Sequence, residues 1–123
     1  MQISLILPHQ LFYPNPILSK SRIVIISKDP LFFNDDKYPM LFHKQKIMLH
    51  NLSIECFAND LKGYGYNVKI LESNIIKSEG FYETYFKSNK ISEVHYLDPH
   101  DFIIEKRLKA AFQKLKIKSH VYD

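Results

Sequence analysis

Two short polar turns in this sequence carry side chains that could bind a ligand through directional hydrogen bonds. Pro8–Gln10 follows the apolar run Ile3–Leu7, and Asp98–His100 follows a second expected strand, Glu93–Leu97. Imidazole, amide and carboxylate groups donate or accept hydrogen bonds along defined directions. Because proline has no N–H to give to a strand, each proline ends its strand and places the adjacent polar side chains at the rim of a sheet. The pattern predicts a binding crevice without a catalytic residue.

The elements that must position these turns alternate between strands and helices. We predict strands at Ile3–Leu7, Arg22–Ile26, Asn67–Leu71, Glu93–Leu97 and Ser119–Tyr122, and helices at His43–Lys62, Phe81–Lys87 and Asp101–Lys116. The first two strands lack polar alternation, which is typical of parallel strands covered on both faces. The order predicts a doubly wound parallel five-stranded sheet between two helical layers, which is a three-layer α/β sandwich of the Rossmann-like (flavodoxin-like) class.

Helical spacing identifies the expected buried faces. In the first long helix the buried stripe is predicted to be Ile54, Phe57, Ala58 and Leu61, and the helix stops near Gly63 and Gly65, which suit a left-handed C-terminal cap. The aromatic cluster Phe81, Tyr82, Tyr85 and Phe86 has the same spacing, so core packing is favoured over stacking on a ligand ring.

The two polar turns are expected to meet. In a doubly wound order the first and fourth strands are neighbours at the switch point, where open α/β sheets bind ligands, so the Pro-His turns would face each other across one crevice. A second interpretation stays open. Asp98 or Asp101 would then cap the following helix, and the histidines would be ordinary surface residues.

Several other chemistries are disfavoured. With three glycines, at positions 63, 65 and 80, the chain can build neither a phosphate-binding loop nor a dinucleotide fingerprint. The single cysteine, Cys56, cannot form an internal disulfide, and we expect it to lie mid-helix among apolar residues as a small hydrophobe rather than a nucleophile. His43 and His50 lie about 10 Å apart along a helix, too far to share a metal ion. His50 and His95 are expected to be packing residues.

Composition indicates one domain spanning residues 1–123 in a reducing compartment. The formal charge of +4 is too small to indicate nucleic-acid binding. No apolar run approaches about 18 residues, and no leader is recognisable at the start, so we expect a cytoplasmic protein without membrane contact.

Four blocks of this sequence resemble, in order and spacing, the N-terminal domain of the photolyase-related proteins that carry an iron–sulfur cluster. These proteins are the prokaryotic six-four photolyases and the bacterial cryptochromes. The blocks are ILPHQL, RIVIISKDPLFF, FHKQKIMLHNLSIECFANDLKGYGYNVKIL and LDPHDF. The resemblance covers essentially the whole chain, and the block beginning FHKQK is its most specific part.

The resemblance implies an antenna module with a Rossmann-like fold that holds 6,7-dimethyl-8-ribityllumazine. The cofactor-binding residues implied for this chain are Pro8, His9, Gln10, Lys28, Asp29, Asp98, Pro99 and His100. Family members often show Gly-Asp where this chain has Pro8-His9, and an acidic residue near the position of Lys28. Both changes remove a carboxylate that would accept a hydrogen bond from a polar ring or a ribityl chain.

In the family a larger helical domain holds FAD and a [4Fe–4S] cluster and contacts DNA. We expect that domain to be absent here, so the chain would be an antenna-chromophore module truncated or split from its catalytic domain, inactive as a photolyase by itself. Its partner would be the helical FAD-binding domain in cis or in trans, and it would reach DNA only through that domain. The alternatives are a degenerate protein-interaction module of the same fold without chromophore and, less favoured, a small nucleotide-binding regulator.

Overall fold

The computed structural model describes residues 1–13, 15–28, 44–72 and 81–122, with side chains in the long helix from Leu49 onward. The strands are β1 (Gln2–Ile6), β2 (Ile23–Ser27), β3 (Val68–Leu71), β4 (Glu93–Leu97) and β5 (Lys118–Tyr122), and the helices are α2 (Lys44–Gly63), α3 (Phe81–Ser88) and α4 (Phe102–Leu115). Each strand and helix predicted from the sequence is present, with ends shifted by one residue where they differ.

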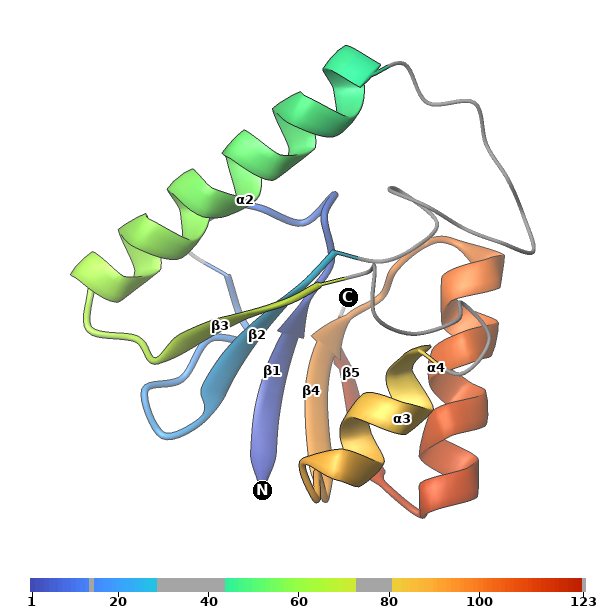
Figure 1. Ribbon diagram of the computed structural model, residues 1–123. Helices are drawn as coiled ribbons and strands as arrows, with labels where there is room; N and C mark the ends of the chain where they lie inside the picture. Colours follow the sequence, from blue (N-terminus) through green and yellow to red (C-terminus); the bar gives the residue numbers. More distant parts are fainter. Residues whose placement is uncertain (14, 29–43, 73–80, 123) are drawn as a thin grey trace.

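The five strands form one parallel sheet in the order β3-β2-β1-β4-β5 (Figure 1). The predicted doubly wound α/β fold is confirmed, and β1 lies beside β4 as expected. This is the Rossmann half-order; in the flavodoxin order, 2-1-3-4-5, β3 would pair with β1. Here β3 pairs with β2 instead, so the flavodoxin-like description is wrong while the Rossmann-like one holds.

Helices cover both faces of the sheet. On one face α2 contributes the predicted stripe, all of it buried against β1, β2 and β3: Ile54, Phe57, Ala58 and Leu61. On the other face α3 and α4 pack together, and their buried side chains join those of β1 and β4. The aromatic cluster supplies Phe81, Tyr82 and Phe86 to this second core, so core packing is confirmed. None of the described helices is long and apolar enough to cross a membrane.

The end of α2 follows the predicted cap. Gly65 has a φ of 96°, the left-handed region that glycine enters without a steric cost. The Tyr66 N–H then donates to the Leu61 carbonyl at 3.0 Å, which is the long backbone bond of a Schellman motif. Cys56 departs from its prediction: it is exposed, because it lies two residues past Ile54 on the outward side of the helix.

The connection from β1 to β2 contains no helix among its described residues, 7–13 and 15–22. Instead Ile17, which is 0% exposed, enters the core beneath α2. Its carbonyl accepts hydrogen bonds from the Ser4 hydroxyl at 2.7 Å and from Arg22 Nη2 at 2.8 Å. The loop is therefore fixed to the sheet by one buried side chain and two polar contacts.

This anchoring predicts the stability of Ile17 variants. Ile17→Ala should lower the free energy of unfolding by about 2–5 kcal/mol, because it removes buried methyl groups and leaves a cavity between the loop and the sheet. Ile17→Val, the matched control, should cost about 0.5–1.5 kcal/mol because the backbone carbonyl and most of the packing stay. Urea unfolding followed by circular dichroism measures both values. Equal, near-zero losses would show that the side chain does not anchor the loop.

Candidate ligand-binding site

A pocket of about 300 Å³ opens at the carboxyl ends of β1 and β4, the switch point of the sheet. Residues from both polar turns line it together with apolar side chains of the β1–β2 connection: His9, Gln10, Phe12, Pro16, Leu97, Asp98 and His100. The two turns predicted to face each other therefore do so. The geometry of each polar side chain decides whether it builds the pocket or is available to a ligand.

His9 joins the two turns. Its Nε2 lies 2.8 Å from the carbonyl oxygen of Pro99. Because a carbonyl only accepts, Nε2 carries the proton in this contact. Pro99 is buried and supplies the carbonyl, whereas the His9 side chain reaches the surface of the pocket. The imidazole thus has a fixed orientation at the wall between β1 and β4.

Gln10 holds the ends of β1 and β4 together. It is 5% exposed, and its Oε1 accepts from the Leu7 N–H at 3.3 Å. Its Nε2 donates to the carbonyls of Leu97 at 3.4 Å and Asp98 at 3.2 Å. Both amide hydrogens are consequently engaged by β4. Gln10 forms the floor of the pocket and holds the strand ends in register. Its amide is used for these contacts rather than for hydrogen bonds to a ligand.

Asp98 and His100 form the opposite wall. His100 has a φ of 51°, an uncommon conformation for a residue with a side chain, and its N–H donates to Asp98 Oδ1 at 2.9 Å. The same oxygen lies 3.9 Å from His100 Nδ1. This Asx-type turn presents the His100 ring to solvent, with its side chain 76% exposed. A carboxylate and an imidazole therefore stand at the mouth of the pocket.

Asp101 has the capping role that the alternative interpretation gave it. Its Oδ1 accepts from the N–H groups of Ile103 at 3.0 Å and Ile104 at 3.1 Å, at the first turn of α4. The two interpretations are compatible, because the helix cap uses the side chain of Asp101, whereas Asp98 and His100 line the pocket.

The two predicted site residues that follow β2 in the sequence, Lys28 and Asp29, are not placed in this pocket by the structure. Lys28 follows β2, and its Nζ pairs with Glu72 Oε2 at 3.1 Å on the side of β3, away from the β4 turn. Asp29 lies outside the described residues, as does His43 at the start of the FHKQK helix. Four of the eight predicted residues line the β1–β4 pocket, namely His9, Gln10, Asp98 and His100. Pro99 supports the pocket wall through its carbonyl, which contacts His9, and Pro8 is not among the lining residues.

A larger recess of about 400 Å³ lies on the outer face of α4. Among the residues that the structure describes, those lining it all belong to this one helix, and the charged pair Glu105 and Lys109 lie 2.6 Å apart. It lacks the convergence of several elements that is typical of ligand sites. The switch-point pocket is the better candidate for binding.

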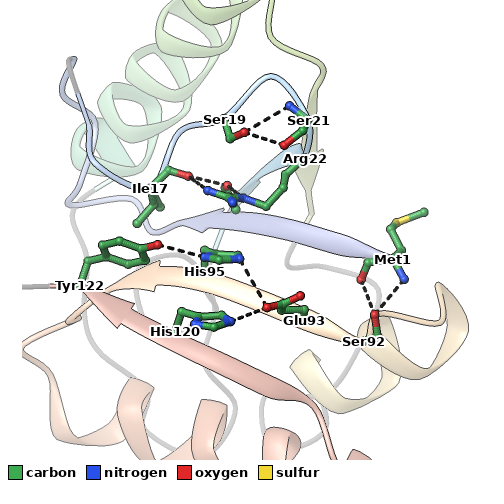
Figure 2. Close-up of polar contacts among 11 residues, drawn as sticks. Met1, Ile17, Ser19, Ser21, Arg22, Ser92, Glu93, His95, His120 and Tyr122 are labelled. Atoms are coloured by element: carbon green, nitrogen blue, oxygen red, sulfur yellow. Dashed lines mark hydrogen bonds and ion pairs between the residues drawn. The ribbon is translucent and has the colours of Figure 1, made fainter.

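A second polar group, which the sequence did not predict, lies on β4 and β5 (Figure 2). The rings of His95 and His120 stack with centroids 4.3 Å apart. The Glu93 carboxylate accepts a hydrogen bond from His120 Nε2, and His95 Nε2 lies 3.9 Å from the same oxygen. His95 Nδ1 shares a hydrogen bond of 3.1 Å with the Tyr122 hydroxyl.

The electrostatics of this group follow from its surroundings. Burial, then the neighbouring charge of Arg22, lowers the pKa of His95, which favours a neutral imidazole. The hydrogen bond from His120 lowers the pKa of Glu93, so its carboxylate stays ionised. His95 is buried as expected for a packing residue, but polar side chains surround one side of its ring.

The sequence carried part of the signal for this group. Glu93 and His95 are two residues apart in a strand, so their side chains point to the same face. His120 is directly opposite His95 only because β5 pairs with β4 in that register. Spacing within the chain cannot reveal a pairing between residues 25 positions apart, which is why the cluster was missed.

A family model for deoxyribodipyrimidine photo-lyase-related proteins matches residues 4–123, nearly the whole chain. The chain belongs to this family. A search of curated proteins found no matching relative. The resemblance carried by the four sequence blocks is confirmed at the level of the photolyase-related family. Both polar turns fall within the matched residues, so the switch-point pocket belongs to the family's domain.

The structural role of Gln10 is testable. Gln10→Leu fills a similar volume but leaves the Leu97 and Asp98 carbonyls without their donor. We expect the free energy of unfolding to fall by about 1–3 kcal/mol, the usual cost of unpaired buried polar groups. His100→Ala, the control, removes an exposed ring and should stay within about 0.5 kcal/mol of the parent. Urea unfolding compares the variants, and an unchanged Gln10→Leu protein would contradict the bridging role.

Proposed function

We propose that the chain is the antenna module of a photolyase-related protein and binds 6,7-dimethyl-8-ribityllumazine in the switch-point pocket. The observation that carries this proposal is the pocket itself. It lies where Rossmann-like sheets bind ligands, it is lined by both polar turns, and its volume of about 300 Å³ is at the lower end of the range for small-molecule sites. The choice of ligand comes from the resemblance to the iron–sulfur photolyase-related proteins, and the family match over residues 4–123 is consistent with that choice.

The two sides of the pocket suit the two sides of the chromophore. Phe12, Pro16 and Leu97 offer an apolar wall for the dimethyl-substituted ring. Asp98 offers a carboxylate that accepts hydrogen bonds from the polar ring edge or from ribityl hydroxyls. The family carboxylates replaced at Pro8-His9 and near Lys28 thus have a counterpart on the β4 side of the pocket.

The same proposal includes docking on a helical domain that holds FAD and the [4Fe–4S] cluster. The outward side of α2 carries two large apolar side chains in adjacent turns, Leu49 at 65% and Leu52 at 56% exposure. Exposed apolar groups spaced three residues apart on a helix present a continuous stripe to a partner. DNA repair or light sensing would be carried out by the flavin domain, with this chain supplying excitation energy.

A fluorescence titration with 6,7-dimethyl-8-ribityllumazine tests the proposal, with FAD and ATP titrated in parallel. We expect saturable micromolar binding of the lumazine alone. His100→Ala should weaken it by roughly 3- to 10-fold, the equivalent of one hydrogen bond of about 0.5–1.5 kcal/mol. His50→Ala is the matched control, because it removes an imidazole on α2 and should leave the affinity unchanged.

Three results would contradict the proposal. Absence of saturable binding by the folded parent chain would leave the interaction module without chromophore as the better description. Preferential binding of ATP or FAD would favour a nucleotide-binding module instead. Equal affinity in the parent, His100→Ala and His9→Ala chains would place the lumazine outside the switch-point pocket. Circular dichroism of each variant separates loss of binding from loss of fold.

A further inference from the structure

Glu93, His95 and His120 bring three potential metal-ligating atoms together on one face of the sheet. One ring nitrogen of each imidazole and a Glu93 carboxylate oxygen lie within 4.8 Å of one another. Both Nε2 atoms point at the same carboxylate oxygen, Oε1 of Glu93 (Figure 2). A small cation requires ligand atoms that converge on one point. Here two neighbouring strands supply such atoms.

We propose that Glu93, His95 and His120 bind a divalent transition-metal ion, for which Zn²⁺ is the best match. Two imidazole nitrogens and one carboxylate oxygen form a set of three protein ligands that Zn²⁺ accepts, with a fourth position left for water. The site is separate from the switch-point pocket, because none of its three ligands lines that pocket. The proposal is independent of the chromophore.

The geometry of β4 and β5 brings the three side chains close together. Glu93 and His95 alternate along β4, so they share a face, and His120 is the direct partner of His95 on β5. Neighbouring strands of a sheet lie only about 4.8 Å apart, so side chains at paired positions on the same face are close. The backbone therefore holds the three groups close together whether or not an ion is bound.

An outer contact already orients one ligand. His95 Nδ1 shares its hydrogen bond with the Tyr122 hydroxyl, which directs Nε2 toward Glu93. Metal-binding histidines usually have such a partner on the second ring nitrogen, where it fixes the tautomer and the ring plane. Tyr122 comes from the same face of β5 as His120, so one strand supplies both a ligand and a supporting group.

The ligand atoms, rather than the surrounding charges, select the class of metal. The set contains one carboxylate, and Arg22 lies close enough to His95 to disfavour a further positive charge there. Lys118 adds a second positive charge near Glu93. These positive charges oppose every divalent cation equally, but Ca²⁺ and Mg²⁺ also need several oxygen ligands, and this set offers a single carboxylate. A transition-metal ion forms stronger bonds to imidazole nitrogen, so the arrangement favours Zn²⁺ and related ions.

Binding requires a small rearrangement of one side chain. The two rings now stack at an angle of 10° between their planes, whereas a metal ion must lie in the plane of each ring it binds. The His120 side chain is 33% exposed and stands on the edge strand, so it has room to rotate. His95 is buried and stays in place, and the ion replaces the direct contact between His120 and Glu93.

Zinc titration of the chain, prepared without a histidine tag and stripped with EDTA, tests the site by isothermal titration calorimetry. We expect one Zn²⁺ per chain, and Co²⁺ at the same site should give the visible absorption of a tetrahedral nitrogen–oxygen complex. Tyr122→Phe keeps all three ligands and should weaken affinity by about 10-fold, as losses of outer-shell partners do. His120→Gln should weaken it by more than the roughly 100-fold upper limit of such outer-shell effects.

The matched control is His50→Gln, which removes one imidazole from α2 and should bind Zn²⁺ as the parent does. Circular dichroism and thermal unfolding of the metal-free variants establish that each is folded. His95→Gln provides a second ligand variant if His120→Gln does not fold. The proposal is overturned if the folded parent binds no Zn²⁺, or if His50→Gln lowers affinity as much as His120→Gln does.

Discussion

The pairing of β1 with β4 is the constraint on which the rest of the structure depends. Parallel hydrogen bonding along these strands aligns Gln2 with Glu93 and Leu5 with Tyr96, so their carboxyl ends finish at the same edge. Gln10 extends the pairing beyond the strands, because its amide reaches the last carbonyls of β4. The two polar turns meet because this strand pair lies at the switch point of the sheet. Without the pairing of β1 with β4, the two walls of the pocket would not face each other.

The connection between β1 and β2 determines which side chains stay accessible on the face of the sheet that α2 covers. In a doubly wound sheet a helix usually crosses from the first strand to the second. Here the described part of that connection is a loop held by the Ile17 side chain and by Arg22, and the face is covered by α2, which follows β2 and packs against β1, β2 and β3. Phe12 and Pro16 of this loop line the pocket. The polar side chains Glu93, His95 and His120 lie at the β4–β5 end of the sheet, past the strands that this loop covers.

Local patterns were sufficient to predict the elements, the fold class and the meeting of the turns. Apolar runs and helical stripes depend on neighbours within about one or two turns of the chain, and alternation of strands with helices restricts the topology to few choices. The role of Gln10 was less accessible. Sequence shows that an amide can donate twice, but it does not show that two backbone carbonyls of another strand already accept both hydrogens.

Residues whose roles depend on strand register were the hardest to predict. Lys28 follows β2 as expected, yet pairing of β2 with β3 brings it to Glu72 rather than to the β4 turn. His120 meets His95 because α4 ends with Lys116 in a left-handed conformation, which fixes where β5 begins. A shift of one residue there would turn His120 to the opposite face.

Tyr122 connects the two polar regions of the sheet. Its carbonyl accepts from the Asp98 N–H at 2.8 Å, which holds the turn at the pocket wall. Its hydroxyl contacts His95 Nδ1, which orients the imidazole beside Glu93. The backbone of one residue thus supports the ligand pocket while its side chain supports the histidine cluster. Because β5 is an edge strand held by β4 alone, the two regions depend on the same set of β4–β5 hydrogen bonds. Local opening of that edge would disturb both regions together, since edge elements with few neighbours open at lower cost than the centre of a sheet.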